Sequence, residues 1–186
     1  MREAVFLFQV SRPEIAFELD LPDRPVLALS DRRLLTQAVT NLVKNASEAI
    51  DSAVEVDAAR AGSGRIVAKV RSKGDRVQIT VIDNGCGLPK EDRHRLVEPY
   101  MTTRAKGTGL GLAIVQRITE QHGGTLMLAD APKRNGKIEG ASVRIDLPVG
   151  EKEEAIAAEA AAEPSAASAS SPSEHAEEEE GVTHGV

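Results

Sequence analysis

Residues 81–112 read VIDNGCGLPKEDRHRLVEPYMTTRAKGTGLGL and contain two glycine-rich segments. The first, DNGCG at residues 83–87, directly follows an alternating apolar run, as expected at the end of a half-buried strand. The second, GTGLGL at residues 107–112, opens a pattern of apolar residues at helical spacing. A polar, basic connector separates the two segments. A strand that ends in one glycine segment and a helix that starts in the other predict a fold that mixes sheet and helix.

The rest of the chain predicts a two-layer architecture. Apolar residues alternate on both sides of a Lys-Gly-Asp turn at residues 73–75, which indicates a β-hairpin. The longest helical pattern, residues 31–53, has one apolar face, and Ser30 or Asp31 can cap its start. The predicted strands cover residues 15–19, 26–29, 66–70, 77–81, 125–129 and 141–147, and the predicted helices cover residues 2–10, 31–53, 90–97 and 109–122. This order predicts an α/β (α+β) fold, a two-layer sandwich in which helices cover one face of a mixed, mostly antiparallel sheet.

Composition divides the chain near residue 150. The 186 residues suffice for one domain with a full core. Residues 151–186 are rich in Ala, Glu, Ser and Pro and almost lack large apolar side chains, so they predict a disordered acidic tail. The whole chain carries a net charge of −6 and the tail carries about −9, which leaves the folded part mildly basic and suited to a polyphosphate ligand. Because no dense Lys/Arg run occurs, we expect no nucleic-acid partner.

Cysteine content and hydropathy indicate a cytoplasmic protein. Cys86 is the only cysteine, so the chain cannot form an internal disulfide, which fits a reducing compartment. No apolar run approaches the roughly 20 residues that span a bilayer, so we expect no membrane contact by this chain. Cys86 is interpreted as a small filler within its glycine segment rather than as a catalytic thiol.

Two asparagines lie four residues apart in the longest predicted helix. Asn41 and Asn45 share one face, with Gln37 a turn earlier. Asparagine is a poor residue for a helix interior, so the pattern calls for a reason. An amide oxygen can ligate Mg²⁺, and the neighbouring Lys44 could meet a phosphate. The alternative is a solvated polar face.

Asp83 ends the predicted strand and enters the first glycine segment. An ionised carboxylate only accepts hydrogen bonds, so Asp83 suits an exocyclic amine such as adenine N6. Gly85 and Gly87 would let the backbone approach a ring closely. The alternative is an ordinary Asp-Asn-Gly turn.

The second glycine segment resembles an anion site at a helix start. Gly107, Gly109 and Gly111 precede or open the helix, where backbone N–H groups attract phosphate, and Lys106 and Thr108 add compatible groups. The spacing matches neither the Rossmann nor the P-loop motif. The alternative is a flexible loop before a helix.

The connector between the two glycine segments has the length of a lid. Arg93, Arg95, Arg104 and Lys106 could neutralise phosphate charge when such a lid closes. The alternative is that these cations are solvent-exposed, and we expect this for at least two of them.

Four ordered motifs resemble those of the GHKL superfamily. NLVKNA at residues 41–46 resembles its N box, residues 83–87 its G1 box and residues 107–112 its G2 box, while Glu98-Pro99-Tyr100 stands at the F box. The sequence His122-Gly123-Gly124 and the closing Leu147-Pro148 also fit. The resemblance covers residues 13–148 and is strongest to bacterial sensor histidine kinases, with residues 98–116 similar to nitrogen-regulation kinases of the NtrY type.

The resemblance implies an ATP site and a reaction class. Asn45 would ligate Mg²⁺, Asp83 would bind adenine N6, and the second glycine segment would hold the phosphates. The implied ATP-binding residues are Asn41, Lys44, Asn45, Asp83, Gly85, Gly87, Lys106, Gly107, Thr108, Gly109, Leu110, Gly111 and Leu112. GHKL hydrolases carry a water-activating Glu at the position of Asn41, where an amide cannot act as a base. The resemblance therefore implies phosphoryl transfer to a protein nucleophile.

Two departures from the family pattern shape the expected role. The F box lacks its usual phenylalanines, and none of the four histidines stands in a phosphoacceptor motif. The chain would then be the catalytic domain (residues 13–150) of a longer two-component kinase, with residues 1–12 as linker and residues 151–186 as tail. Its partners would be the dimerisation and phosphoacceptor domain and a response regulator, in a parent that could be membrane-anchored. The alternatives are a serine kinase of the anti-sigma-factor kind and a non-enzymatic nucleotide-binding switch.

Overall fold

The computed structural model describes residues 1–26, 28, 30–101, 108–133 and 139–149. Its strands are β1 (Ala16–Asp20), β2 (Arg65–Lys73), β3 (Arg76–Asp83), β4 (Thr125–Asp130) and β5 (Ala141–Pro148). Its α-helices are α1 (Arg2–Ser11), α2 (Arg32–Val56) and α3 (Gly111–Gln121), and two short 3₁₀ helices are η1 (Ala58–Arg60) and η2 (Arg93–Val97).

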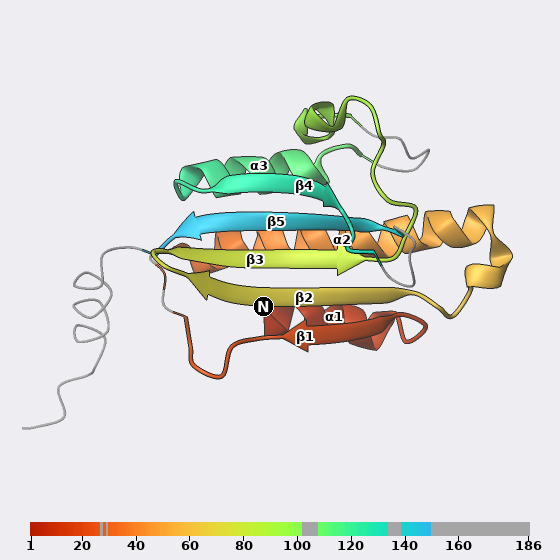
Figure 1. Cartoon of the computed structure of the whole chain (residues 1–186), viewed down its shortest axis with the longest axis horizontal. Coiled ribbons are helices and arrows are strands. Elements are labelled where there is room, and N and C mark those ends of the chain that lie inside the picture. The colour runs from red at the N-terminus through yellow and green to blue at the C-terminus, as the bar shows by residue number, and fades with distance from the viewer. Residues whose placement is uncertain (27, 29, 102–107, 134–138, 150–186) are drawn as a thin grey trace, which may run out of the picture.

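The five strands form one sheet in the order β1-β2-β3-β5-β4. β1 pairs with β2 in parallel, and the other three pairings are antiparallel. The three α-helices lie on one face of this sheet and leave the other face open (Figure 1). The predicted two-layer α/β sandwich with a mixed, mostly antiparallel sheet is confirmed.

Aliphatic side chains fill the space between the layers. Along β3 the burial alternates, so Val77, Ile79 and Val81 face the helices while the residues between them face the open side. The facing stripe on α2 includes Leu42 and Val43, which are almost fully buried. The period of two in the strand and of 3.6 in the helix thus direct their apolar residues into one core.

The start of α2 is joined to the end of α3. The carboxylate of Asp31 accepts hydrogen bonds from the backbone N–H groups of Leu34 (3.0 Å) and Arg33 (2.8 Å), and these bonds lower the pKa of Asp31. The N–H of Asp31 donates to Nε2 of His122 (3.0 Å), whose Nδ1 lies 2.7 Å from the carbonyl oxygen of Ile118. A neutral imidazole with its proton on Nδ1 satisfies both contacts. Of the two predicted caps, Ser30 and Asp31, the structure has Asp31, and the imidazole joins the start of α2 to the end of α3.

Three predicted elements differ from the structure. The helix predicted at residues 90–97 is the shorter 3₁₀ helix η2 (Arg93–Val97). Val26 and Ala28 lie outside any strand, and residues 27 and 29 lie outside the described residues. Pro25, which has no N–H to donate to a ladder, precedes this segment, and Val26 and Ala28 pack against the core instead. The helix predicted from residue 109 begins at Gly111 because Gly109 has a φ of +67°, which a right-handed helix excludes.

The N-terminal segment contributes to the core. Ala4 and Val5 of α1 are buried against α2 and the sheet. The proposed boundary at residue 13 remains a prediction, and the predicted tail at residues 151–186 lies outside the described residues. Within the described part of the chain, every helix is too short or too polar to cross a membrane.

Asp146 on β5 is expected to make the fold sensitive to acid. Burial raises the pKa of this carboxyl, but its hydrogen bonds with Arg76 and Gln78 outweigh burial and leave the pKa below its usual value. A folded-state pKa below the unfolded value of 3.8 stabilises the fold above that pH, and this stability is lost as pH falls through the folded pKa. Asp146→Asn should lower the free energy of unfolding at pH 7 by about 1 kcal/mol.

Urea unfolding at pH 7 and pH 3 checks this prediction. The difference in stability between the two pH values should be smaller in Asp146→Asn than in the wild type. Asp23→Asn, which removes the same charge from an exposed position, is the matched control. An unchanged pH dependence in Asp146→Asn would show that other carboxylates control acid unfolding.

Candidate functional site

A cavity of about 370 Å³ opens between α2, the end of β3 and the start of α3. It brings together the two glycine segments and the asparagine pair, which are far apart in the sequence. The predicted site residues that line it are Asn41, Lys44, Asn45, Asp83, Gly87, Thr108, Gly109, Leu110, Gly111 and Leu112. Lys106 and Gly107 lie outside the described residues.

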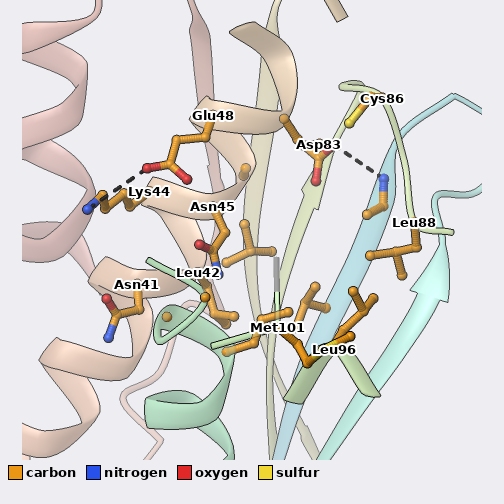
Figure 2. Close-up of a pocket in the computed structure, with 18 of the residues that line it drawn as sticks. Asn41, Leu42, Lys44, Asn45, Glu48, Asp83, Cys86, Leu88, Leu96 and Met101 are labelled. Atoms are coloured by element: carbon orange, nitrogen blue, oxygen red, sulfur yellow. Dashed lines mark hydrogen bonds and ion pairs between the residues drawn. The ribbon is translucent and has the colours of Figure 1, made fainter. Parts of the chain in front are cut away.

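One wall of the cavity is the polar face of α2. Asn41, Lys44 and Asn45 project from it (Figure 2), and Glu48 continues the face by one further turn. The ammonium group of Lys44 lies 3.9 Å from the Glu48 carboxylate. Gln37 is exposed and does not line the cavity, so the predicted stripe of three amides contributes two to the site.

Asp83 is held at the opposite wall with its carboxylate almost fully buried. Only 6% of the residue is exposed to solvent. Its Oδ1 accepts hydrogen bonds from the N–H of Gly85 (2.8 Å) and from the N–H of Ala141 at the start of β5 (3.3 Å). Two donors on one oxygen hold the carboxylate plane in a single orientation, which suits directional recognition of a hydrogen-bond donor.

Gly85 has a different place from the one predicted. It packs on the backbone of α2, where a Cβ atom would lie 2.6 Å from the carbonyl oxygen of Ala49, and it does not line the cavity. The next residue, Cys86, donates its N–H to the same carbonyl oxygen (3.0 Å). Gly85 therefore lets the segment dock on α2, while Gly87 faces the cavity.

The second glycine segment brings the start of α3 beside Asn45. A Cβ atom on Gly111 would lie 2.9 Å from Oδ1 of Asn45, so a larger residue at position 111 would crowd this amide. The N-cap residue, Leu110, has an apolar side chain that supplies no capping acceptor. The first N–H groups of α3 therefore suit an anionic ligand at this end of the cavity.

The connector after β3 is tied to the sheet by Arg93. Its Nε donates to the carbonyl oxygen of Pro89 (2.7 Å), and its guanidinium pairs with Asp130 at the end of β4. Arg95 pairs with Asp92 and Glu98 within the connector. Neither arginine lines the cavity, so the expected phosphate contacts of Arg93 and Arg95 are absent from this arrangement of the described residues; Arg104 lies outside them.

Several lining residues escaped the sequence interpretation. They are mainly apolar side chains that could enclose a ring, together with one carboxylate: Leu88, Leu96, Met101, Ile114, Val143 and Glu48. Leu88, Leu96 and Met101 lie in the connector, where no periodicity marks them, whereas Glu48 follows Asn45 by one turn and could have been found. Cys86 is exposed at the cavity rim and is not a buried filler.

The chain belongs to the family of histidine kinase-, DNA gyrase B- and HSP90-like ATPases. The sequence pattern of this family matches residues 30–151 of the chain. It is 52% identical over 137 residues to nitrogen regulation protein NtrY of Azorhizobium caulinodans, a match that covers 73% of this chain and 17% of NtrY. It is 40% identical over 137 residues to sensor histidine kinase ZraS of Klebsiella oxytoca, covering 72% of this chain and 26% of ZraS. The solved structure of the mycobacterial sensor histidine kinase MprB matches with a TM-score of 0.66 and 26% identity, covering 79% of this chain and 90% of that structure.

These similarities confirm the resemblance to the ATP-binding catalytic domain of NtrY-like sensor histidine kinases. They support the histidine-kinase interpretation and give no support to the serine kinase or to the non-enzymatic switch. The chain spans less than a third of the length of either relative.

Proposed function

We propose that this chain binds ATP and passes its γ-phosphoryl group to a histidine on a phosphoacceptor domain outside the chain, as part of a two-component kinase for nitrogen regulation. One observation carries the proposal. A single cavity joins a fixed carboxylate, an amide-bearing helix face and a glycine-rich helix start. The carboxylate suits the base, the amide-bearing helix face suits a metal ion on the phosphates, and the helix start suits the phosphates themselves.

The adenine base would lie at the Asp83 end of the cavity. An exocyclic amine can donate to the buried carboxylate, while the apolar side chains of Leu88, Leu96 and Met101 are placed to cover a ring (Figure 2). Guanine presents a carbonyl oxygen where adenine presents this amine, and an oxygen facing a carboxylate is unfavourable. The site should therefore prefer ATP to GTP.

The phosphates would lie between α2 and the start of α3. Lys44 and the N–H groups at the start of α3 suit negative charge. The donor set also fits Mg²⁺, because Asn41 and Asn45 offer amide oxygens and Glu48 adds a carboxylate to the same wall. Asn45 would hold the ion and Asn41 would line its site; when bound, Mg²⁺ supplies positive charge to the phosphates.

The reaction class is phosphoryl transfer. An imidazole nitrogen of the incoming histidine would attack the γ-phosphorus, the bond from the γ-phosphorus to the bridging oxygen would break, and ADP would leave. The amide of Asn41 cannot take a proton from water. Glu48 is a carboxylate in the same cavity, and it lies 3.9 Å from the ammonium group of Lys44.

The proposed setting follows from the relatives. The domain would work in the cytoplasm, within a parent kinase that is membrane-anchored. It would meet the dimerisation and phosphoacceptor domain of the parent, and a response regulator would take the phosphoryl group from the histidine. The similarity to NtrY and ZraS supports these partners at the level of the family.

Two linked experiments test the proposed function. In calorimetric titrations with Mg²⁺, the chain should bind ATP, and GTP should bind at least roughly tenfold more weakly, as expected for a mispaired polar group. With γ-labelled ATP and the separately expressed phosphoacceptor domain of the parent kinase, label should appear on histidine, as an acid-labile phosphoramidate. Acid-stable label on serine would overturn the histidine assignment in favour of a serine kinase, and ATP binding without transfer would favour the switch.

A further inference from the structure

The chain just before β5 lies in direct backbone contact with the Asp83 segment. Gly140 is buried, and a Cβ atom added to it would overlap the carbonyl oxygen of Asp83 and lie 2.6 Å from Cα of Asn84. Its φ of +90° also lies in the region that residues with a side chain rarely adopt. Position 140 is thus restricted by both contact and backbone conformation.

The same segment donates a hydrogen bond to the recognition carboxylate. The N–H of Ala141, next to Gly140, points at Oδ1 of Asp83 over 3.3 Å, and Figure 2 shows this contact between Asp83 and β5. The other donor to this oxygen, Gly85, belongs to the turn that follows Asp83 itself. The donor from β5 therefore ties the carboxylate to a part of the chain that is distant in sequence.

Further contacts hold this segment in place from both sides. The carbonyl oxygen of Gly140 accepts from the N–H of Ala131 (3.1 Å), just after β4. Arg60 donates to the carbonyl oxygen of Asn84 and lies 3.9 Å from the carboxylate of Glu139. These contacts hold the start of β5 against the turn that follows Asp83.

We propose that Gly140 is a positioning residue for base recognition, acting through the carboxylate of Asp83. The inference rests on the proposed function, because it assumes that Asp83 receives the adenine amine. Hydrogen bonds weaken steeply when their distance or angle departs from the optimum. A side chain at position 140 would push the Asp83 backbone away from β5, lengthen the bond from Ala141, and turn the carboxylate away from the base. The preference for adenine over guanine would fall, whereas binding of the phosphates would be retained.

Gly140→Ala tests the proposal, with Gly74→Ala as its matched control. Gly74, in the β2–β3 turn, has a φ of +61°, but a Cβ atom there would meet nothing within 4 Å. Both variants carry the backbone strain, and only Gly140→Ala adds the collision. We expect Gly140→Ala to bind ATP about tenfold more weakly and to bring the ATP-to-GTP affinity ratio towards one. Gly74→Ala should keep the wild-type ratio.

A double-mutant cycle separates positioning from a general loss of structure. In an Asp83→Asn background, adding Gly140→Ala should cost less than about threefold in ATP affinity, because residues that act through one contact are not additive. Fully additive losses, or an unchanged ATP-to-GTP ratio in Gly140→Ala, would overturn the proposal. If Asp83→Asn alone leaves ATP affinity unchanged, the adenine assignment of the proposed function fails instead.

A second variant decides the matter if Gly140→Ala does not fold. Ala141→Pro removes the N–H that reaches Asp83 and adds no bulk at position 140. Proline is tolerated at the first residue of a strand, which Ala141 occupies. A folded Ala141→Pro variant should show the same fall in the ATP-to-GTP ratio. A wild-type ratio in that variant would overturn the proposal.

Discussion

Asp83→Asn should lower the affinity for ATP by roughly 100-fold, because a donor would replace an acceptor at a buried site. The amide oxygen of asparagine can still accept from the N–H groups of Gly85 and Ala141, so the side chain should keep its orientation. Its amide nitrogen then takes the place of the second carboxylate oxygen and faces the adenine amine with two N–H donors. The change is therefore isosteric, but it sets donor against donor and removes the hydrogen bond. Calorimetric titration with ATP and Mg²⁺ measures the effect.

Asp146→Asn is the matched control for the lost charge. Asp146 lies on β5 and makes its bonds with Arg76 and Gln78, and it does not line the cavity. Its substitution should leave the affinity for ATP at the wild-type value at pH 7. Unchanged ATP affinity in Asp83→Asn would remove Asp83 from the adenine site, and an equal loss in both variants would indicate a general effect of charge.

Asn45→Ala should abolish the Mg²⁺ dependence of ATP binding, an effect of about tenfold or more if Asn45 is a metal ligand. Its amide lies on the cavity wall beside the start of α3, where a Cβ atom on Gly111 would crowd it. Loss of the amide removes an oxygen donor without changing the helix, because alanine is a strong helix former. Titrations with ATP in Mg²⁺ and in EDTA give the ratio that should fall to about one.

Two further substitutions are controls for the effect of Asn45→Ala on Mg²⁺ dependence. Asn45→Asp retains an oxygen at the same place and should preserve the dependence on Mg²⁺. Gln37→Ala removes an exposed amide from the same helix, outside the cavity, and should behave as the wild type. If Asn45→Ala keeps its Mg²⁺ dependence, the ion lies elsewhere, and Glu48 on the same wall becomes the residue to change.

Local signals predicted the elements that carry the site. The alternation in β3, the cap at Asp31 and the asparagine spacing on α2 each depend on residues close in sequence, and the structure confirms them. The strand predicted at residues 26–29 is wrong at Val26 and Ala28, which pack against the core and belong to no strand. Pattern alone does not distinguish an apolar strand from an apolar coil that packs on the core.

Side-chain roles at the site could be predicted only in part. The motif around Asp83 identified the carboxylate. It also predicted that Gly85 faces a ligand, which is wrong because Gly85 packs against α2. Gly140 was not singled out at all, because it lies far along the chain from Asp83 and in no motif. Its importance arises from a backbone contact that exists only after β5 has paired with β3.

Residue identities and their local spacing are enough to predict which chemical groups the site has and which elements carry them. An acceptor carboxylate at a strand end, amides one helical turn apart and glycines at a helix start follow from residue identity and short-range periodicity. Only the folded chain sets how these groups meet, which glycine faces the cavity, and that the N–H of Ala141 on β5 bonds to the carboxylate of Asp83. The physical reason is that identity and spacing act over a few residues, whereas orientation at the site depends on contacts between strands and helices distant in sequence.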